Sequence, residues 1–237
     1  MPFLQCRDRQ PELMDQPGLE ESLHHAALAG LARVNWMSGG VPAMWRHLKS
    51  MARTASANRP LRILDVACGG GDVIVRLALR ARKHGLPLQF EGCDLSETAL
   101  KLGEQLTHKK RLLNVRFIQH NVMCDPFPDR YDVILCSLFL HHLEESDAVI
   151  LLRNMAQSAR LGILVDDLLR TQLGFLLCWG GSRFLSWSPI VWNDGPLSVR
   201  AAFTLDEARQ LASQAGLNCI QLRRHWPERF LLSWTRE

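Results

Sequence analysis

The sequence predicts an α/β protein built on a doubly wound, mostly parallel sheet of seven strands. Apolar segments at 61–66, 88–93, 115–120, 131–136 and 162–167 alternate with stretches of helical periodicity. Strands that alternate with helices of about 10–15 residues are typical of βαβ units and of a parallel sheet. Ligands of such sheets bind at the carboxyl ends of the strands, so the polar residues that follow these segments are candidate site residues.

The composition is that of an ordinary soluble domain. Of the 237 residues, 47% are apolar and 22% charged, and the net charge of +4 is too small to indicate a nucleic-acid partner. The seven cysteines form no CxxC pair, which argues against a disulfide framework or a zinc site and favours a reducing compartment. No stretch reaches the roughly 18 uninterrupted apolar residues of a membrane span, and residues 1–18 have no apolar core of a signal peptide. We expect a cytoplasmic protein.

The N-terminal part should be helical after a flexible leader. Residues 1–18 mix prolines and charges, whereas 19–35 carries apolar residues at helical spacing. Pro42 is expected to open a second helix, and residues 56–60 are expected to form a loop. Two helices are therefore predicted within 19–58.

Helix signals also occur within the region 61–167. Gly85 can end a helix that begins at Asp72. Ser96 is a candidate N-cap for a helix that ends near residue 106, and Ser146 for a helix over 147–157.

The alternation breaks after residue 168. Residues 169–200 are rich in tryptophan, phenylalanine and glycine, and form either a lid over an apolar substrate or a core helix. The position of the break favours the lid, and a polar turn is expected at 194–200, where Arg200 could clamp an anion or form a surface salt bridge. In 204–237, Thr204 and Glu207 form a capping box for a last helix, and strands are expected near 217–224 and 229–235.

A glycine-rich turn follows the first predicted strand, in the sequence DVACGGGD (65–72). Gly69 and Gly71 allow a tight turn and a close approach of backbone to ligand. Asp94 ends the next strand and is placed to accept hydrogen bonds from a ribose diol. Ile74 stands where a dinucleotide fingerprint has its third glycine, which argues against NAD or FAD, and no phosphate-binding P-loop motif is present.

Four segments in order resemble the class I S-adenosylmethionine-dependent methyltransferases: DVACGGGD, CDLS (93–96), HNVMCDPFPD (120–129) and YDVILCSLFLHHL (131–143). The resemblance implies the Rossmann-like methyltransferase fold over 19–237, with the cofactor-binding core at 61–167. It also implies S-adenosyl-L-methionine as cofactor, with the glycine turn at its methionine and ribose part. The cofactor-binding residues that it implies are Asp65, Ala67, Gly69, Gly71, Asp94, Leu95, Asn121, Val122 and Cys136.

A second resemblance lies ahead of that core. The segment RVNWMSGGVPAMW (33–45) is similar to the corresponding part of quinone-biosynthesis C-methyltransferases, although the tyrosine and aspartate usual in those enzymes are absent before Asn35. It implies kinship among methyltransferases of lipids or aromatic compounds, not identity of substrate.

Two adjacent histidines and an aspartate are the candidate catalytic residues. His141 or His142 could take a proton from a phenol, line the pocket, or cap local backbone. Asp167 ends a strand at the expected site, where it or Asp166 could position substrate or act as base. No metal site is expected, because two neighbouring histidines need further ligands to complete a coordination shell.

These observations lead to one main hypothesis, methyl transfer to an oxygen or carbon of a hydrophobic small molecule, aromatic, polyketide-like or quinol-like. A nicotinamide-dependent oxidoreductase and a non-catalytic member of the same fold are the alternatives. Nucleic-acid or protein methylation is a third alternative, disfavoured because the chain lacks both the N/D-P-P-Y/F motif of amino-nitrogen methylation in nucleic acids and an extended basic face. The expected partner is a small molecule, with no nucleic acid and no stable membrane insertion; the oligomeric state is left open.

Overall fold

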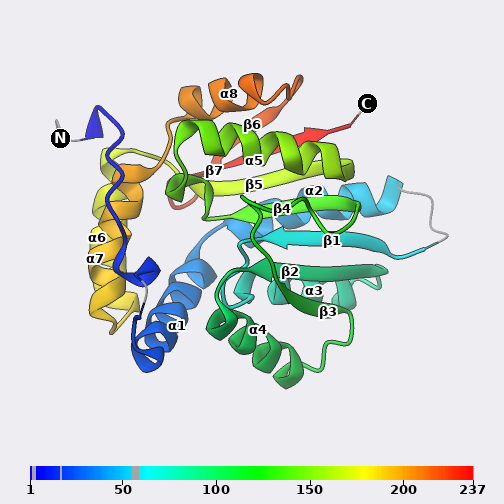
Figure 1. Cartoon of the computed structure of the whole chain (residues 1–237), viewed down its shortest axis with the longest axis horizontal. Coiled ribbons are helices and arrows are strands. Elements are labelled where there is room, and N and C mark those ends of the chain that lie inside the picture. Colours follow the sequence, from blue (N-terminus) through cyan, green and yellow to red (C-terminus); the bar gives the residue numbers. More distant parts are fainter. Residues whose placement is uncertain (2–3, 17, 55–58, 237) are drawn as a thin grey trace.

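A seven-stranded sheet with strand order β3-β2-β1-β4-β5-β7-β6 forms the centre of the molecule (Figure 1). This computed structural model describes residues 1, 4–16, 18–54 and 59–236. Six strands run in the same direction, and only β7 runs antiparallel to its neighbours β5 and β6. The predicted doubly wound, mostly parallel sheet is confirmed. The strands are β1 (Leu61–Val66), β2 (Leu88–Asp94), β3 (Val115–Gln119), β4 (Tyr131–Ser137), β5 (Ala159–Leu168), β6 (Gln221–His225) and β7 (Arg229–Thr235).

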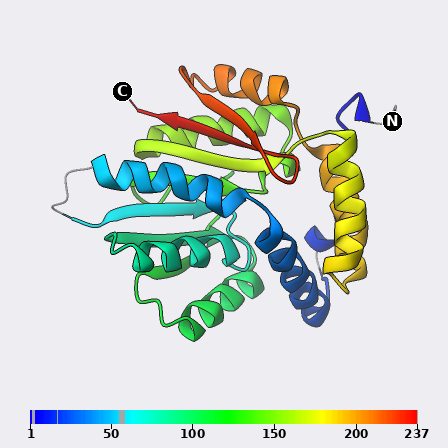
Figure 2. The same ribbon diagram turned by 180° about the vertical axis from the view of Figure 1, so that it is seen from behind.

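Helices cover both faces of this sheet (Figures 1 and 2). Helices α5 (Glu145–Ser158) and α8 (Leu205–Gln214) bury one apolar face against it, and α2 (Gly40–Thr54) and α3 (Asp72–Lys83) bury the other. Helix α4 (Glu97–Lys109) packs beside α3 along β2 and β3. Within the described part of the chain, no helix is long and apolar enough to cross a membrane.

Two of the predicted helix starts are confirmed in atomic detail. The Ser96 hydroxyl accepts a hydrogen bond from the Ala99 N–H at 3.2 Å, and Thr204 and Glu207 form the complete capping box. Ser146 is not an N-cap, because α5 begins at Glu145, two residues before the expected start at 147, and its N-cap residue is Glu144. Helix α2 likewise begins at Gly40 rather than at Pro42, and β6 is shorter than the strand expected at 217–224. Most of the loop predicted at 56–60 lies outside the described residues.

Residues 169–200 form a pair of helices, α6 (Gln172–Leu185) and α7 (Pro189–Ala201), which pack on α1 (Glu21–Met37) beyond the carboxyl edge of the sheet. The turn expected at 194–200 is wrong: those residues belong to α7 up to its last turn. Phe184 and Trp187 are 89% and 88% exposed, so these aromatic side chains do not fill a core.

The described residues of the 1–18 segment, expected to be a flexible leader, run along α7 and end near α1 (Figure 1). The Arg7 guanidinium donates to the carbonyl of Ala201 at 2.6 Å and stacks over Phe203. The buried Asp194 carboxylate of α7 accepts the backbone N–H groups of Leu13 and Met14, each at 2.9 Å. This segment is thus tied to the helical pair at both of its ends.

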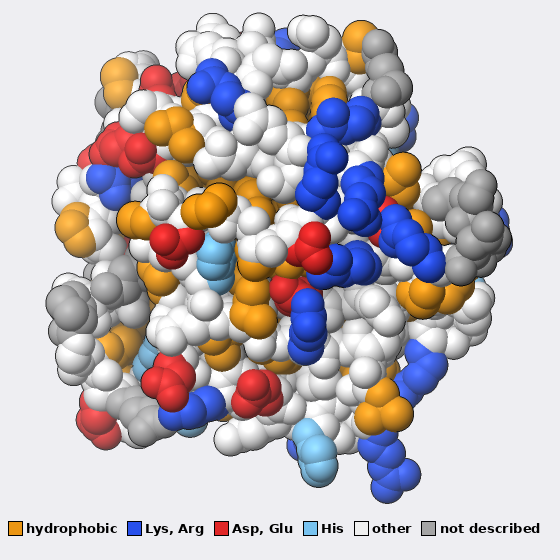
Figure 3. Space-filling view, turned by 45° about the vertical axis from the view of Figure 1, so that its right-hand side comes forward, with side chains coloured by type: hydrophobic (Ala, Val, Ile, Leu, Met, Phe, Trp, Pro, Cys, Tyr) orange, Lys and Arg blue, Asp and Glu red, His pale blue; other side chains and the backbone are white. Residues whose placement is uncertain are grey.

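The side of the molecule away from the α6–α7 pair carries a band of Lys and Arg side chains interspersed with Asp and Glu (Figure 3). At the amino ends of the strands, arginines are paired with acids: Arg59 with Asp132 at 2.6 Å, and Arg62 with Asp129. Arg200, a candidate anion clamp, forms an ion pair with Asp8.

Arg170→Met is expected to lower the free energy of unfolding by about 2–3 kcal/mol. Its side chain is buried, binds Glu207 through two nitrogens at 2.6 and 2.9 Å, and donates to the carbonyls of Ala202 and Leu4. Urea denaturation measures the loss. Arg209→Met, which removes an exposed pair with Asp206, should change stability by under about 0.5 kcal/mol; equal effects of the two changes would contradict the prediction.

Candidate functional site

A cavity of about 1070 Å³ opens at the carboxyl ends of β1, β2 and β4. Its other walls come from α1, from the α6–α7 pair and from the N-terminal segment. Ligand pockets usually measure roughly 300–1,000 Å³, so this one has room for a nucleoside cofactor and a second molecule. Nine of the twelve predicted site residues line it: Asp65, Ala67, Gly69, Asp94, Leu95, Asn121, Val122, His141 and His142.

The glycine turn joins β1 to α3 through left-handed backbone. Ala67, Gly69 and Gly71 have φ of 51°, 52° and 73°. Gly71 does not line the cavity; it is the N-cap residue of α3, and a Cβ there would lie 2.7 Å from Phe117. The turn therefore presents backbone to the cavity at Gly69 and requires glycine at 71 for packing beneath it.

Asp94 organises that turn from the end of β2. Its Oδ2 accepts the Gly69 N–H at 2.8 Å, and its Oδ1 accepts the Ser96 N–H at 2.9 Å. An ionised carboxylate has about four lone-pair sites, so each oxygen can still accept from a hydroxyl in the cavity. Its position suits recognition of a diol.

Asp65 places a buried carboxyl group in the cavity wall. Its side chain is buried, and both carboxyl oxygens lack a hydrogen-bond partner among the described residues. Burial, followed by the charges of Asp72 and Asp94, raises the pKa of Asp65 to about 8. Unpaired buried polar groups are costly, so this wall favours a ligand that brings a cation or a hydrogen-bond donor.

An arginine lies in the same cavity, contributed by the antiparallel strand β7. Arg229 donates to the Asn35 side chain at 2.9 Å and faces Asp166 at 3.4 Å, and its Nε has no partner in the described part of the chain. Sequence reasoning missed this residue. It reaches the site through the pairing of Arg229 with Leu168 between β7 and β5, for which the sequence offers no local signal.

Asn121 and Val122 line the cavity after β3. The Asn121 side chain also accepts the Met123 N–H at 3.0 Å, so it supports a local turn while facing the site. Leu95 lines the cavity and is 60% exposed.

The structure does not bring Cys136 to the cavity. Its thiol is fully buried in the core cluster beneath the sheet, and burial raises its pKa well above the ordinary value. The three residues after it, Ser137, Leu138 and Phe139, line the cavity instead. Successive side chains of a strand point to opposite faces, so the motif reaches the site only from the last residue of β4, Ser137, onward.

His141 and His142 lie in the short 3₁₀ turn η3 (Leu140–His142) after β4. Asp167 contacts the cavity only through His141: its Oδ1 lies 2.6 Å from the His141 Nδ1, and its Oδ2 accepts the His141 N–H at 3.1 Å. Burial alone would raise the pKa of Asp167, but the charge and hydrogen bonds of His141 hold it below the ordinary value. The carboxylate therefore fixes the orientation of the imidazole.

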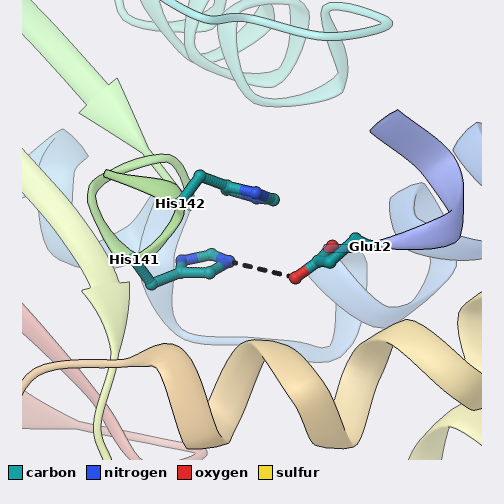
Figure 4. Close-up of side chains that lie close together, drawn as sticks. All are labelled: Glu12, His141 and His142. Carbon is teal, nitrogen blue, oxygen red and sulfur yellow. Dashed lines mark ion pairs between the residues drawn. The ribbon is translucent and has the colours of Figure 1, made fainter. Parts of the chain in front are cut away.

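Glu12 joins these histidines from the N-terminal segment (Figure 4). Its Oε1 lies 4.0 Å from the His141 Nε2 and accepts the Ser198 hydroxyl at 2.6 Å. Burial raises the pKa of Glu12, and the two histidines oppose that shift. Sequence reasoning placed Glu12 in the leader, because no local pattern connects it with residues on the other side of the fold.

Comparison with known proteins agrees with this arrangement. The model of a methyltransferase domain family matches residues 63–162. A ubiquinone/menaquinone biosynthesis C-methyltransferase (UbiE) of Shewanella piezotolerans is 31% identical over 132 residues, covering 54% of this chain and 51% of that protein. A demethylmenaquinone methyltransferase of Geobacillus kaustophilus is 35% identical over 104 residues, covering 42% and 43%. The chain thus matches about half the length of these relatives.

Solved structures share the fold over most of the chain. An O-methyltransferase family 2 protein of Planctomyces limnophilus, in complex with apigenin, has a TM-score of 0.68 at 18% identity, covering 94% of this chain and 63% of that one. Magnesium protoporphyrin IX methyltransferase of Synechocystis, with bound S-adenosylhomocysteine, has a TM-score of 0.59 at 15% identity, covering 94% and 91%.

The matched domain, the strand order and the glycine turn followed by Asp94 agree with one another. Residues 63–162 match a methyltransferase domain, and the chain is similar to class I S-adenosylmethionine-dependent methyltransferases, loosely to their quinone-biosynthesis members.

Proposed function

We propose that this protein transfers a methyl group from S-adenosylmethionine to a hydrophobic small molecule. The observation that carries the proposal is the glycine turn held by Asp94 beside the unpaired Asp65 carboxyl, all in one large cavity. When bound, the cofactor supplies an electrophilic methyl group on a sulfonium sulfur, which keeps the electron pair of the broken C–S bond.

The cavity wall fits each part of this cofactor. Asp94 would accept hydrogen bonds from the ribose diol, and Asn121 and Val122 would flank the adenine. Asp65 would pair with the ammonium of the methionine part, and the Arg229 guanidinium with its carboxylate. Ala67, Gly69 and Leu95 would border the ligand, whereas Gly71 would support the turn from below and Cys136 would act only as packing.

The acceptor would occupy the part of the cavity between η3, α1 and the α6–α7 pair. Leu138, Phe139, Leu28 and Leu31 give this region an apolar lining. The relatives named for ubiquinone and menaquinone biosynthesis and the neighbour in complex with apigenin support an aromatic or quinol-like acceptor. Because the methyl group is already activated, the main tasks of the protein are in-line positioning and exclusion of water.

His141, His142 and Asp167 would act on the acceptor: a histidine would remove its proton, and Asp167 would position His141. Asp167 holds the His141 ring, and the His142 ring, tilted by 34° to it with 4.3 Å between centroids, faces the same cavity. Either imidazole can take the proton from a phenolic or enolic acceptor as the new bond to carbon forms.

We further infer a single domain over 19–237, a reducing, cytoplasmic setting and no nucleic-acid partner. Free cysteines in the described part of the chain support the reducing compartment. The α6–α7 pair, which contributes Cys178, Gly195 and Ser198 to the cavity wall, would be the lid.

Asp94→Ala is expected to weaken S-adenosylmethionine binding by about 10–100-fold, because the change removes the diol acceptor and releases the Gly69 N–H. Isothermal titration measures the affinity, and a panel of phenols and quinols tests methyl transfer. Asp206→Ala, on the exposed side of α8, is the control. Binding of NADH in place of S-adenosylmethionine would support an oxidoreductase, and cofactor binding with no transfer to any acceptor would support a non-catalytic role.

A further inference from the structure

We propose that Glu12, His141 and His142 form a binding site for a divalent transition-metal ion such as Zn²⁺ or Fe²⁺. Each side chain offers one ligand atom, and these atoms all lie within 4.8 Å of one another (Figure 4). The sequence predicted no metal site because two adjacent histidines need another ligand. Glu12 supplies it from the far end of the chain.

The outer contacts of this cluster are those of a metal-binding histidine. Such a histidine usually gives its second ring nitrogen to a carboxylate, which fixes the tautomer and makes the free nitrogen a better ligand. Here the His141 Nδ1 lies 2.6 Å from Asp167, and its Nε2 points toward Glu12. The Ser198 hydroxyl holds the Glu12 carboxylate in the same way, at 2.6 Å.

The backbone that carries the two histidines is also held in place. Arg7 donates to the carbonyls of His141 and Leu143 at 2.8 and 2.6 Å, and Asp167 accepts the His141 N–H. Arg7 and Glu12 belong to the same N-terminal segment, so that segment both positions η3 and completes the cluster. A site built in this way needs little rearrangement to bind.

Geometry and burial both favour a small cation. The side chains of Glu12 and His141 are only 10% and 4% exposed. In a tetrahedral site with bonds of about 2.0–2.2 Å, ligand atoms lie roughly 3.3–3.5 Å apart. The pair now at 4.0 Å would close by less than about 1 Å, which rotation of the Glu12 side chain can provide.

Two imidazoles and one carboxylate leave at least one coordination position open. That donor set is used by catalytic zinc sites and by non-haem iron sites. The three residues line the cavity, so the open position faces the space assigned to the acceptor. With an ion bound, the two imidazoles would act as ligands in place of the base role described above: a hydroxyl bound at the open position would release its proton to water more readily, and its oxygen would keep the electron pair that attacks the methyl group. This role rests on the proposed function, but metal binding itself does not.

Titration of the metal-free full chain with Zn²⁺ in the presence of a competing chelator, and with Co²⁺ followed by visible absorption, tests the site. We expect one ion per chain and a tetrahedral Co²⁺ spectrum. Glu12→Gln and His142→Asn should each weaken Zn²⁺ binding by more than about 100-fold, and Asp167→Asn by about 10–100-fold. His108→Asn, at the exposed end of α4, is the matched control.

Absence of stoichiometric binding by the unmodified chain, or equal Zn²⁺ affinity in Glu12→Gln and His108→Asn, would overturn the site. Thermal melts and S-adenosylmethionine titration of the same variants show whether they are folded. Zn²⁺ binding without S-adenosylmethionine binding would retain the metal site and refute the proposed function, and the converse would refute only the metal site.

Discussion

Asp65→Asn is expected to weaken S-adenosylmethionine binding by about 10–100-fold and, at the same time, to stabilise the empty protein above about pH 8. The carboxyl is buried without a partner among the residues described, so its charge is unfavourable in the empty cavity. The same charge becomes favourable when the cationic cofactor arrives, because it then has an ammonium to bind. Removing the carboxyl should therefore raise the stability of the empty protein and lower its affinity for the cofactor.

The pH dependence follows from the pKa of Asp65, raised from 3.8 to about 8 in the folded protein. Below about pH 4 the carboxyl is protonated in both states, and folding costs nothing extra. Between about pH 4 and pH 8 the unfolded chain loses the proton that the folded protein keeps, so stability falls as the pH rises and levels off above about pH 8. Asparagine has no such proton, so the advantage of the variant should grow over that range.

Thermal melts at about pH 5 and about pH 9, with titration of S-adenosylmethionine at both, measure these effects. Wild-type affinity should rise with pH toward about 8, as the carboxyl ionises, and the variant should lose that dependence. Asp206→Asn, an exposed aspartate on α8, is the control. A variant that is less stable than the wild type at the higher pH would show that Asp65 has a partner in solution.

Asp167→Asn is expected to lower the rate of methyl transfer by about 100-fold while leaving S-adenosylmethionine affinity within about 3-fold of wild type. The Asp167 carboxylate accepts from both the ring and the backbone of His141, and an amide cannot hold the imidazole in the same tautomer. Asp167 is a positioning residue, since it reaches the cavity only through His141.

Rates measured across a pH series distinguish this role from loss of structure. If Asp167 orients His141, the pH profile of the variant should shift together with the fall in kcat. The depressed pKa of Asp167 adds a second signature: the stability that the pair contributes is present above about pH 4 and is lost as the pH falls through the folded pKa. A variant with the wild-type pH profile and a uniformly lower rate would refute the positioning role.

Features that depend on neighbouring residues could be predicted well. The Ser96 cap and the Thr204–Glu207 box act across three residues, and both are present. The glycine turn and Asp94 each follow a strand whose apolar run is evident, so their meeting at one edge follows from parallel pairing. The sequence of residues 169–200 did not show that they form two helices. The glycines at 180 and 181 look like helix breakers, but they lie within α6 with open space around them, where glycine is tolerated in a helix whose other face is packed.

Some features of this protein thus follow from local sequence patterns, and others only from its tertiary structure. Alternation of apolar segments, the glycine turn and the order of four motifs were enough to predict the sheet and the cofactor class, and nine of the twelve residues proposed for the site line the cavity. Only the tertiary structure placed Glu12 beside His141, and Arg229 beside Asn35 across 194 residues of chain. Hydrogen bonds within a turn leave a signature in adjacent residues, whereas contacts between distant segments depend on how whole elements pack, which no short stretch of sequence encodes.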